Sequence, residues 1–408
     1  MTETTLHTTC CIAGGGPAGM MVGFLLARAG IDVVVLEKHK DFFRDFRGDT
    51  IHPSTFELMH ELGLLEEFLQ LPHQEVTEIG AHFSNQFFRM ADFSHLNVAK
   101  PALGFMPQWE FLNFLRQKAE RYKRFHLLLE ADAQKLVRED GKVVGVEAET
   151  AEGTKTIYAK LVIAADGRRS LLREEAQLKV INYGVPIDVL WFKLSRQSAD
   201  SKSAFGFFNG GKLMVLLNRN EYWQCGYVIP KGDFDSIRQK DLASFRQELA
   251  VAVPFLKERT EELTDWEQIK LLNVAVDRLE KWYCEGLVCI GDAAHAMSPV
   301  GGVGINLALQ DAVAAANILY PVLKENKNPG TEALEQIQKR REPPTKSTQR
   351  LQLIIQNNFL SRRLNEDKNM PPPLMLRLFN RFKILRRIPA RLIGIGMRAE
   401  HIQTPEIT

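Results

Sequence analysis

The chain has 408 residues, of which 45% are apolar and 25% charged, and its formal net charge is +2. This composition excludes a disordered or collagen-like chain. The length exceeds what one hydrophobic core serves, so we expect at least two domains. A nearly balanced charge also argues against a dedicated nucleic-acid-binding protein.

The sequence carries no clear sign of export or of membrane insertion. We find no apolar run of the ~18 residues that a spanning helix needs, and the N-terminus lacks the basic start and apolar stretch of a secretory signal. The cysteines are odd in number and form no C-x-x-C pair, which predicts reduced thiols in a cytoplasmic protein and no metal site. They are Cys10, Cys11, Cys225, Cys284 and Cys289.

The first forty residues predict a dinucleotide-binding unit. Residues 9–13 are an apolar strand, and residues 14–19 read GGGPAG, which fits G-x-G-x-x-G. An apolar helical pattern then runs to Ala29 and ends at Gly30, and a second apolar strand at residues 32–36 is followed by Glu37. Strand, glycine turn, helix, strand and acid in this order are typical of a site for NAD or FAD.

Each residue type in this unit has a physical task. Gly14 allows the tight turn, Gly16 lets the backbone approach a pyrophosphate, and Gly19 lets the helix pack closely on the strand. The N-terminus of the helix offers N–H groups and a positive dipole end to phosphates. Glu37 can accept hydrogen bonds from ribose hydroxyls, which favours NAD or FAD over NADP at this site. The alternative is a glycine-rich turn without a ligand.

Two later segments also place glycine and aspartate directly after an apolar strand. Residues 161–173 read LVIAADGRRSLLR, with a strand at 161–165 and then Asp166-Gly167. Residues 287–312 read LVCIGDAAHAMSPVGGVGINLALQDA, with a strand at 287–290 and then Gly291-Asp292. A proline-glycine turn at 299–304 precedes a helix that we expect to begin at about Ile305.

With these three motifs in order, the sequence resembles the FAD-dependent aromatic hydroxylases, the p-hydroxybenzoate hydroxylase-like single-component flavoprotein monooxygenases. FRGDTIHPST at 46–55 and MPQWEFLNFL at 106–115 also look like segments of that family. The resemblance covers nearly the whole chain. It implies an α/β fold with a discontinuous Rossmann-like FAD-binding domain, a β-sheet substrate domain and a C-terminal helical segment.

The resemblance also implies roles for individual residues. The ADP half of FAD would lie against the glycine turn and Glu37, Asp292 would bond the ribityl hydroxyls, and the 301–306 turn would lie near the pyrimidine edge of the flavin. Arg47 and Pro299 are the candidate catalytic residues. The candidate cofactor-binding residues are Gly14, Gly16, Pro17, Ala18, Glu37, Lys38, Arg47, Gln108, Asp166, Asp292, Gly301, Gly302, Gly304, Ile305 and Asn306.

Several of these side chains have a structural alternative. Asp292 could cap the next helix, because Asp is a preferred N-cap residue. Arg47 could be a solvated surface charge. His295 reads as a hydrogen-bonded structural histidine rather than a base, and His52, before Pro53, is open to either interpretation.

The resemblance implies a reaction in which the cofactor supplies the chemistry. Reduction of the flavin by NADPH or NADH, reaction with O₂ to a C4a-hydroperoxide and transfer of OH to an electron-rich ring would follow, with the Pro299 carbonyl placing the hydroperoxide. The absence of a second G-x-G-x-x-G predicts no separate nicotinamide domain. The basic run of Lys38, His39, Lys40 and Arg44 could meet the phosphates of the donor, or could be a solvated loop.

The motif strands are far apart in the sequence, so we expect the FAD-binding domain at residues 1–75, 101–180 and 272–340. Segments 76–100 and 181–271 read as a β-rich substrate domain, because short aromatic or β-branched runs alternate with turn residues. An aromatic face suits a flat apolar substrate, although each of these side chains could simply be core. The candidate lining residues are Phe83, Phe207, Met214, Trp223 and Tyr227.

The C-terminal region, residues 341–408, is expected to be helical, with Pro343-Pro344 as an interruption. Residues 370–398 carry seven Lys or Arg and no Asp or Glu, and apolar residues recur there at near-helical spacing. Pro389 predicts two helices rather than one. We expect a cap packed on the flavin domain; the alternative is an interfacial helix on anionic lipid or a partner.

The sequence thus predicts a NAD(P)H-dependent FAD monooxygenase that hydroxylates an aromatic or polycyclic small molecule, as a monomer or homodimer. A related FAD reductase or halogenase is one alternative. The run WQCGYVIP at 223–230 lacks the first Gly and second Trp of the halogenase signature GWxWxIP, which argues against halogenation. A non-catalytic FAD-binding protein that sequesters a metabolite is the other alternative.

Overall fold

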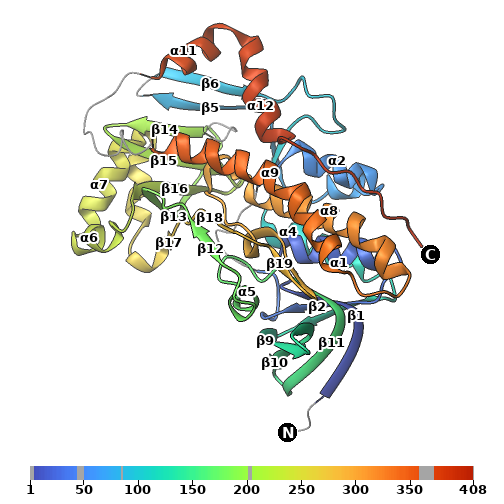
Figure 1. Ribbon diagram of the computed structural model, residues 1–408. Helices are drawn as coiled ribbons and strands as arrows, with labels where there is room; N and C mark the ends of the chain where they lie inside the picture. The colour runs from blue at the N-terminus through green and yellow to red at the C-terminus, as the bar shows by residue number, and fades with distance from the viewer. Residues whose placement is uncertain (1–3, 44–49, 84–85, 201–204, 358–371, 408) are drawn as a thin grey trace.

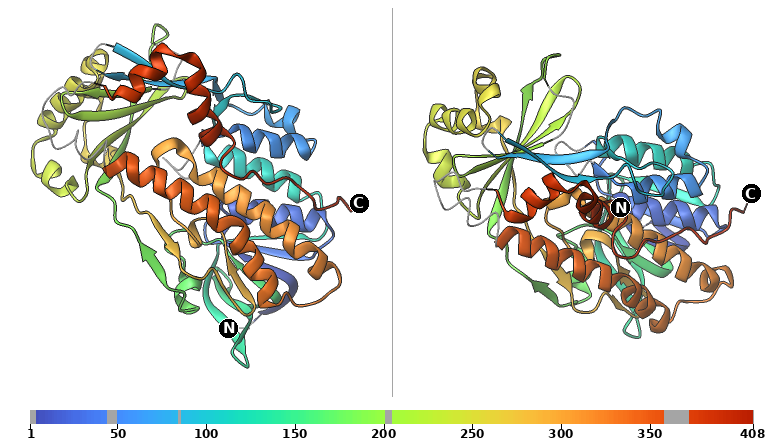
Figure 2. Two further views of the ribbon diagram at one scale, coloured as in Figure 1. Left: turned by 45° about the horizontal axis from the view of Figure 1, so that its top comes forward. Right: turned by 90° about the horizontal axis from the view of Figure 1, so that it is seen from above.

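The computed structural model describes residues 4–43, 50–83, 86–200, 205–357 and 372–407 (Figure 1). The chain forms one mixed eight-stranded sheet with helices packed against it and a second, seven-stranded sheet at the other end of the molecule (Figure 2). Two smaller sheets and a helical C-terminal region complete the fold.

The eight-stranded sheet contains all three motif strands. Its central strands run parallel in the order β20, β11, β1, β2 and β8, with β19 antiparallel at one edge and the β9–β10 hairpin attached to β11. The strands are β1 (Thr4–Ala13), β2 (Val33–Glu37), β8 (Phe125–Leu129), β9 (Ala131–Glu139), β10 (Lys142–Thr150), β11 (Gly153–Ala164), β19 (Tyr283–Cys284) and β20 (Leu287–Cys289).

The two faces of this sheet bury different layers because side chains alternate along a strand. Ile12, Val35 and Ile163 face the helical layer, whereas Cys11, Val34 and Val162 face the β9–β10 hairpin and α5. β1 begins before the apolar run of the sequence because its polar first half pairs with the long strand β11. The helices here are α1 (Pro17–Arg28), α2 (Pro53–Glu61), α3 (Leu65–Phe68), α4 (Gln108–Ala119), α5 (Leu171–Glu175) and α8 (Gly304–Lys324).

The seven-stranded sheet has the order β17, β13, β16, β15, β14, β5 and β6, and so combines strands from residues 78–92 and 187–272. Its helices α6 and α7 and the 3-10 helix η1 cover one face. The strands are β5 (Glu78–Phe83), β6 (Gln86–Asp92), β13 (Ile187–Ser195), β14 (Phe205–Asn209), β15 (Lys212–Asn218), β16 (Tyr222–Pro230) and β17 (Lys270–Leu272). The helices are α6 (Phe234–Gln239), α7 (Leu242–Ala252), η1 (Pro254–Glu262) and η2 (Trp266–Gln268).

Two small sheets join these parts. The three-stranded sheet has the order β3, β7 and β4, and the two-stranded sheet pairs β12 with β18. Their strands are β3 (Thr50–Ile51), β4 (Gln74–Val76), β7 (Leu103–Phe105), β12 (Val180–Asn182) and β18 (Asp277–Leu279). They lie where the chain passes between the two large sheets (Figure 1).

Helix α9 (Thr331–Ile355) corrects one expectation, because it continues through Pro343 and Pro344 instead of being interrupted there. Its buried polar side chains hold it in place: Gln349 donates to Asp277 O at 2.7 Å and Gln352 to Ser298 O at 3.0 Å. Such bonds to other segments, in the turns that follow the prolines, offset the backbone bonds that the prolines remove. The boundary drawn at residue 340 therefore falls inside a continuous helix.

Among the described residues, one helical stretch, Val300–Lys324, is long and apolar enough by composition to cross a membrane. This corrects the expectation that the sequence holds no such run. The stretch is 72% buried inside the protein over its most apolar window, where α8 packs against α1 and α9. It is therefore a core helix in this fold.

The basic region forms α11 (Leu374–Arg381), η6 (Lys383–Arg386) and α12 (Arg387–Gly394). Two helices are present as expected, but the break lies at Phe382, whose backbone is extended, and not at Pro389. Pro389 lies in the first turn of α12, where backbone N–H groups have no partner within the helix, so proline is tolerated. These helices lie over β6, and the chain end returns to α1, where Ile407 N donates to Arg28 O at 2.9 Å.

Candidate functional site

Four sequence segments meet at the carboxyl ends of adjacent parallel strands. Ala13 of β1 lies beside both Leu36 of β2 and Ala164 of β11, and Ala164 lies beside Cys289 of β20. The glycine turn, Glu37, Asp166-Gly167 and Gly291-Asp292 each follow one of these strands. Ligands of open α/β sheets bind at this edge.

The glycine turn is packed tightly on one side and open on the other. At Gly14, whose φ is +107°, an added Cβ would lie 2.3 Å from Ala165 O, and at Gly19 it would lie 1.9 Å from Gly14 O. At Gly16 an added Cβ would meet no atom within 4 Å. The open side therefore faces the space in front of α1.

Helix α1 begins at this open side. Gly16 is its N-cap and supplies no side-chain bond, Pro17 occupies the first turn, and Ala18 is buried against the Gly291 turn. A helix N-terminus that no side chain caps keeps its N–H groups and the positive end of its dipole available to an anion. Gly16 and Pro17 thus form a site suited to a pyrophosphate.

Glu37 lies next to the glycine turn. Its Oε2 accepts from Gly15 N at 3.0 Å and its Oε1 from His39 N at 3.1 Å. Each carboxylate oxygen has a further lone pair, so the same side chain can also accept from a ribose hydroxyl. Lys38, by contrast, is exposed, as are His39 and Lys40.

Asp292 and Arg168 connect two of the motifs. Arg168 Nη2 donates to Asp292 Oδ2 at 3.2 Å, and both side chains are about one-third exposed. The neighbouring Arg173 is buried and donates to Arg168 O at 2.6 Å and to Ala293 O at 3.3 Å. Asp292 lies in η3 (Gly291–Ala293) and accepts from the Arg168 guanidinium, so it is held at the strand edge by charge.

Asp166 points toward α5. Its Oδ2 accepts from Leu172 N at 3.4 Å, and its Oδ1 is buried without a hydrogen-bond partner among the described residues. Burial raises the pKa of this carboxyl group. Through these contacts the Asp166 carboxylate holds the turn in place, and it points toward α5 rather than outward.

The 299–306 segment forms η4 (Val300–Gly302) and the start of α8. Gly301 and Gly302 have φ values of +82° and +61°, and a Cβ at Gly302 would lie 2.7 Å from Thr50 Oγ1. The Pro299 carbonyl accepts from Gly302 N at 3.0 Å, so part of its acceptor capacity closes this turn. Gly304 opens a 21-residue helix, and no atom lies within 4 Å of where its Cβ would be.

Asn306 joins this turn to the segment before α2. Its Oδ1 accepts from His52 N at 2.9 Å and from Thr55 Oγ1 at 2.7 Å, and its Nδ2 donates to Thr50 O at 3.1 Å. A side chain with these bonds acts as a brace and has little capacity left for a ligand. Ile305 is buried in the core.

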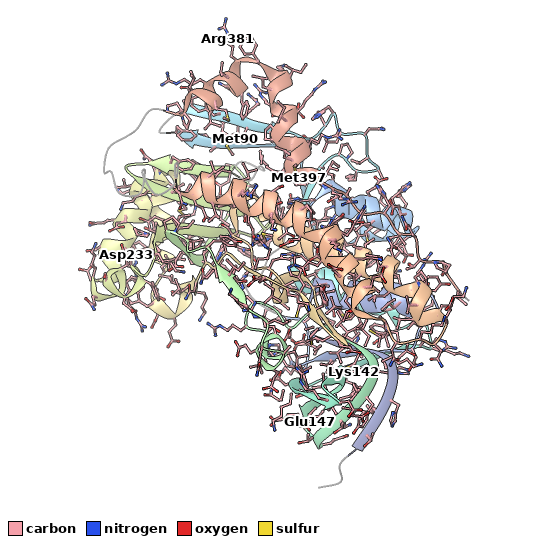
Figure 3. All side chains as sticks on the ribbon, in the orientation of Figure 1. Met90, Lys142, Glu147, Asp233, Arg381 and Met397 are labelled. Carbon is pink, nitrogen blue, oxygen red and sulfur yellow. The ribbon has the colours of Figure 1, made fainter. Side chains whose placement is uncertain are left out.

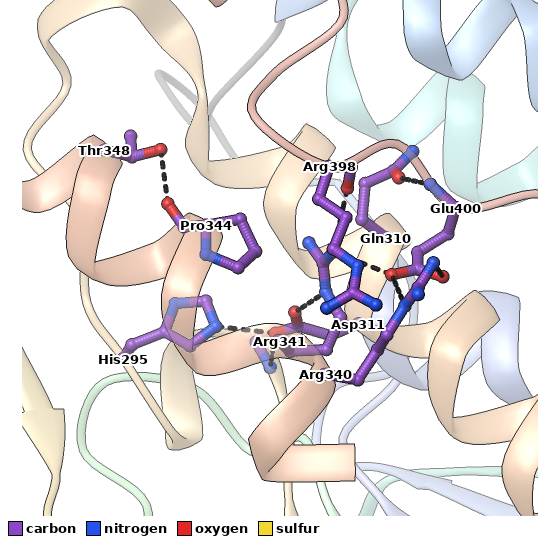
Figure 4. Close-up of polar contacts among 10 residues, drawn as sticks. His295, Gln310, Asp311, Arg340, Arg341, Pro344, Thr348, Arg398 and Glu400 are labelled. Carbon is purple, nitrogen blue, oxygen red and sulfur yellow. Dashed lines mark hydrogen bonds and ion pairs between the residues drawn. The ribbon is translucent and has the colours of Figure 1, made fainter. Parts of the chain in front are cut away.

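A buried ionic network lies behind the Gly291-Asp292 turn (Figure 4). Asp311 Oδ2 accepts from Gly291 N at 3.1 Å and lies 2.6 Å from His295 Nε2, and Asp311 Oδ1 accepts from Arg341 Nε at 2.9 Å. Arg341 also contacts Glu400 at 3.0 Å, and Arg340 forms two bonds with the same carboxylate. His295 is thus structural, as one of its two interpretations proposed.

His52 is also buried and forms part of the frame. Its Nδ1 lies 2.7 Å from Ile393 O, which requires that this nitrogen carry the proton. Burial lowers the pKa of His52 to about 4, although hydrogen bonds to backbone carbonyls partly offset this effect. His52 is therefore neutral near pH 7 and joins α2 to the C-terminal helix α12.

Gln108 makes no side-chain hydrogen bond among the described residues. Gln108 is the half-buried first residue of α4. Arg47, like Arg44, lies outside the described residues. Among the described residues, no cluster of three or more His, Cys, Asp or Glu side chains could hold a metal ion.

Four of the five candidate lining residues are buried in core clusters and Phe207 is half-buried, because the sequence did not reveal which face of the second sheet each occupies. Phe207, Met214, Trp223 and Tyr227 pack on the face covered by α7 and η1. Tyr227 OH donates to Glu248 at 3.1 Å and Trp223 Nε1 to Asp200 at 3.0 Å. Phe83 lies in a separate buried cluster near Leu376 of α11. Phe207 packs against the first of these clusters and is half-buried, and the other four are core residues.

The opposite face of the second sheet meets the 299–304 turn. Leu213, Val228 and the half-buried Trp191 belong to the apolar cluster that contains Val300. Trp191 lies over Gly226, where an added Cβ would be 3.0 Å from the indole ring, and its Nε1 has no hydrogen-bond partner among the described residues. The period-two alternation of β13 places Trp191 here, a signal that was present in the sequence.

The described residues fit FAD. The open space at Gly16 and the uncapped start of α1 suit the pyrophosphate, Glu37 suits a ribose, and Asp292 lies on the adjacent strand end. The start of α8 provides a second uncapped helix N-terminus, suited to negative charge on a reduced flavin.

Comparison with known proteins agrees with this site. A family model described as "FAD binding domain" matches residues 7–350. The chain belongs to this FAD-binding family. It is the family of the flavoprotein aromatic hydroxylases, and several of its sequence relatives are named as monooxygenases.

Individual members share the sequence or the fold. 6-Methylpretetramide 4-monooxygenase of Streptomyces rimosus is 29% identical over 364 residues, which are 87% of this chain and 85% of the relative. PqsL of Pseudomonas aeruginosa, described as a probable FAD-dependent monooxygenase, superposes with a TM-score of 0.75 at 20% identity over 88% of this chain and 98% of its own. p-Nitrophenol 4-monooxygenase PnpA of Pseudomonas putida superposes with a TM-score of 0.76 at 20% identity over 97% of this chain and all of its own.

Proposed function

We propose that this family member is a NAD(P)H-dependent monooxygenase that hydroxylates an aromatic or polycyclic small molecule. The observation that carries the proposal is the convergence of the glycine turn, Glu37 and Asp292 on one edge of the sheet. The relative that is 29% identical is named a 6-methylpretetramide 4-monooxygenase, which supports the monooxygenase reaction.

Bound FAD would take electrons from NAD(P)H and supply activated dioxygen, which no amino-acid side chain provides. The chain itself holds and orients the cofactor. The start of α1 and Glu37 would hold the ADP half, and Asp292, fixed by Arg168, would accept from the ribityl hydroxyls. The uncapped start of α8 would stabilise negative charge on the reduced cofactor.

The second sheet would supply the wall of the substrate site. Its face with Trp191, Leu213 and Val228 meets Val300 in an apolar cluster, and apolar surroundings exclude water from a reacting flavin. The buried Trp191 N–H can donate to an oxygen atom of a substrate. Exposed Lys38, His39 and Lys40 are placed on the surface where they could meet the phosphates of a visiting donor.

Turnover under ¹⁸O₂ tests this proposal. The FAD-loaded protein is supplied with NADH or NADPH and a panel of phenols, naphthols and tetracyclic aromatics, and donor oxidation, peroxide and product mass are measured. The expected result is donor oxidation accelerated by one aromatic class, with one ¹⁸O atom in the product. Donor oxidation matched by peroxide with every compound would contradict hydroxylation, and reduction of a compound without ¹⁸O would favour the reductase alternative.

A cytoplasmic location is a further proposal. The thiols of Cys10, Cys11, Cys225 and Cys289 are buried and free, and burial raises the pKa of Cys11 to about 12, which keeps this thiol protonated and unreactive. Such thiols suit a reducing compartment. Fractionation of the source cells should recover the protein in the cytoplasmic compartment, at the membrane face or free of it, with its thiols reduced.

A further inference from the structure

The segment from Leu374 to Arg398 exposes to solvent apolar side chains of the kind that are usually buried in a core. Leu374 is 71% exposed and Ile384 66%, whereas core residues of the same type are below 9%. We call this the C-terminal amphipathic surface. Its exposed apolar residues are Leu374, Met375, Leu378, Phe382, Ile384, Ile388, Leu392 and Met397.

Positive charges are interleaved with these apolar residues. No acidic residue occurs between residues 370 and 398. In Figure 3 Arg381 projects away from the body of the protein. The exposed basic residues of the surface are Arg377, Arg381, Lys383, Arg387, Arg391 and Arg398.

The opposite side of the same segment is anchored. Gly394 packs against Phe93 and Leu96, where an added Cβ would lie about 3.1 and 3.0 Å from their side chains, and Ala390 is fully buried. Arg386 is buried and donates to Phe379 O at 2.8 Å and Asn380 O at 2.9 Å, which fixes the corner between α11 and α12. The expectation of a cap on the flavin domain is therefore corrected: one side of the segment packs mainly on β6 of the second sheet, and the other side faces outward.

We propose that the C-terminal amphipathic surface binds the face of an anionic lipid bilayer. Short helices with apolar and basic side chains on one exposed surface lie in the plane of a bilayer, with the apolar groups among the acyl chains and the cations at the headgroups. Charge decides against a second copy of this chain, because two such cationic surfaces would repel. The many exposed aliphatic side chains do not suit phosphate recognition on a nucleic acid.

Flotation of the FAD-loaded full chain with vesicles tests the proposal. The vesicles are pure phosphatidylcholine or a mixture with phosphatidylglycerol. We expect at least tenfold more protein to float with the anionic vesicles at low salt, and the preference to fall at 1 M salt, where the Debye length is about 3 Å. Recovery of the protein in the soluble fraction with both vesicles would overturn the proposal.

Substitutions separate the two components of the surface. The triple variant Leu378→Asp, Ile384→Asp, Ile388→Asp should lose binding to anionic vesicles at least tenfold. The triple variant Arg377→Gln, Arg381→Gln, Arg387→Gln should lose the preference for anionic over neutral vesicles. Visible absorbance of the bound flavin confirms that each variant is folded.

Matched controls change exposed residues elsewhere. Val251→Asp with Leu271→Asp, and Lys142→Gln with Lys179→Gln, should float like the unchanged protein. If the control variants lost binding to anionic vesicles to the same extent, the assignment of the surface would be overturned. Light scattering that showed a dimer which the apolar triple variant dissociates would also overturn it, because a second copy would then be the occupant.

Discussion

Asp311 Oδ2 lies 2.6 Å from His295 Nε2 and also accepts the N–H of Gly291 at 3.1 Å, although Asp311 and His295 are almost fully buried. Burial alone would raise the pKa of Asp311, but His295 and Arg341 outweigh it and hold the pKa below its usual value. Asp311, which lies in α8, therefore holds in place the turn that carries Asp292.

Asp311→Ala should destabilise the protein by about 3–5 kcal/mol, because it leaves His295 buried without its partner and Arg341 with Glu400 as its remaining carboxylate. Urea unfolding of the variant and of the unchanged protein measures the difference. The control Glu120→Ala removes an exposed pair with Arg116 and should cost less than about 1 kcal/mol. Equal effects of the two substitutions would show that the network is not a structural brace.

Asp292→Ala should weaken FAD binding by about 10- to 100-fold, since one bond from a charged group is worth about 1.5–3 kcal/mol. Fluorescence titration of the FAD-free protein with FAD measures the affinity. The matched control is Asp132→Ala on β9, which should bind FAD normally. Full flavin occupancy of Asp292→Ala at low FAD would refute the assignment of Asp292.

A side chain added at Gly16 should prevent FAD binding, whereas a side chain added at Gly19 should lower the stability of the fold. A Cβ at Gly16 would meet no protein atom within 4 Å, so Gly16→Val should cost less than about 1 kcal/mol of stability. The valine side chain would, however, occupy the pyrophosphate site and abolish FAD binding. Gly19→Ala should destabilise by about 3 kcal/mol, because its Cβ would lie 1.9 Å from Gly14 O. Thermal unfolding without FAD and FAD titration separate the effects. Normal FAD affinity in Gly16→Val would contradict the site.

His52 should make the fold sensitive to acid. Its pKa is about 4 when folded and about 6.5 when unfolded, so the unfolded state binds more protons between these values. The stability that neutral His52 contributes is complete above pH 6.5 and is lost as the pH falls toward 4. Between pH 7 and 4.5 this loss is about 2 kcal/mol.

His52→Gln should remove this dependence. The free energy of unfolding at pH 7 and at pH 4.5, from urea titrations, gives the change for each protein. The unchanged protein should lose about 2 kcal/mol more than the variant over this range. The same pH dependence in both proteins would mean that His52 is not buried in its neutral form.

The sequence predicted the FAD-binding sheet well, because its signals are local. Apolar runs define the strands, and Gly14, Gly16 and Glu37 lie at fixed distances from them. The faces of the second sheet were not predictable by residue type alone, because β16 is buried on both faces and aromatic residues occur on each. Only the pairing of strands shows that Trp223 and Tyr227 face α7.

Local sequence patterns also could not predict the contacts between segments that are distant in the sequence. Asp311, Arg341 and Glu400 come from three separate elements, and no spacing in the sequence links them. α9 continues through Pro343 because its buried glutamines bond to other segments, which proline rules do not include. The spacing in the basic segment indicated an amphipathic helix, but not that its apolar side would face outward.

The visible absorption spectrum of the purified protein, with release and mass identification of its pigment, tests the central claim most directly. The account predicts a yellow protein with the bands of oxidised flavin, one FAD per chain, a lower flavin content in Asp292→Ala and loss of the colour in Gly16→Val. A colourless protein that takes up no FAD from excess would contradict the cofactor site, and with it the proposed hydroxylation.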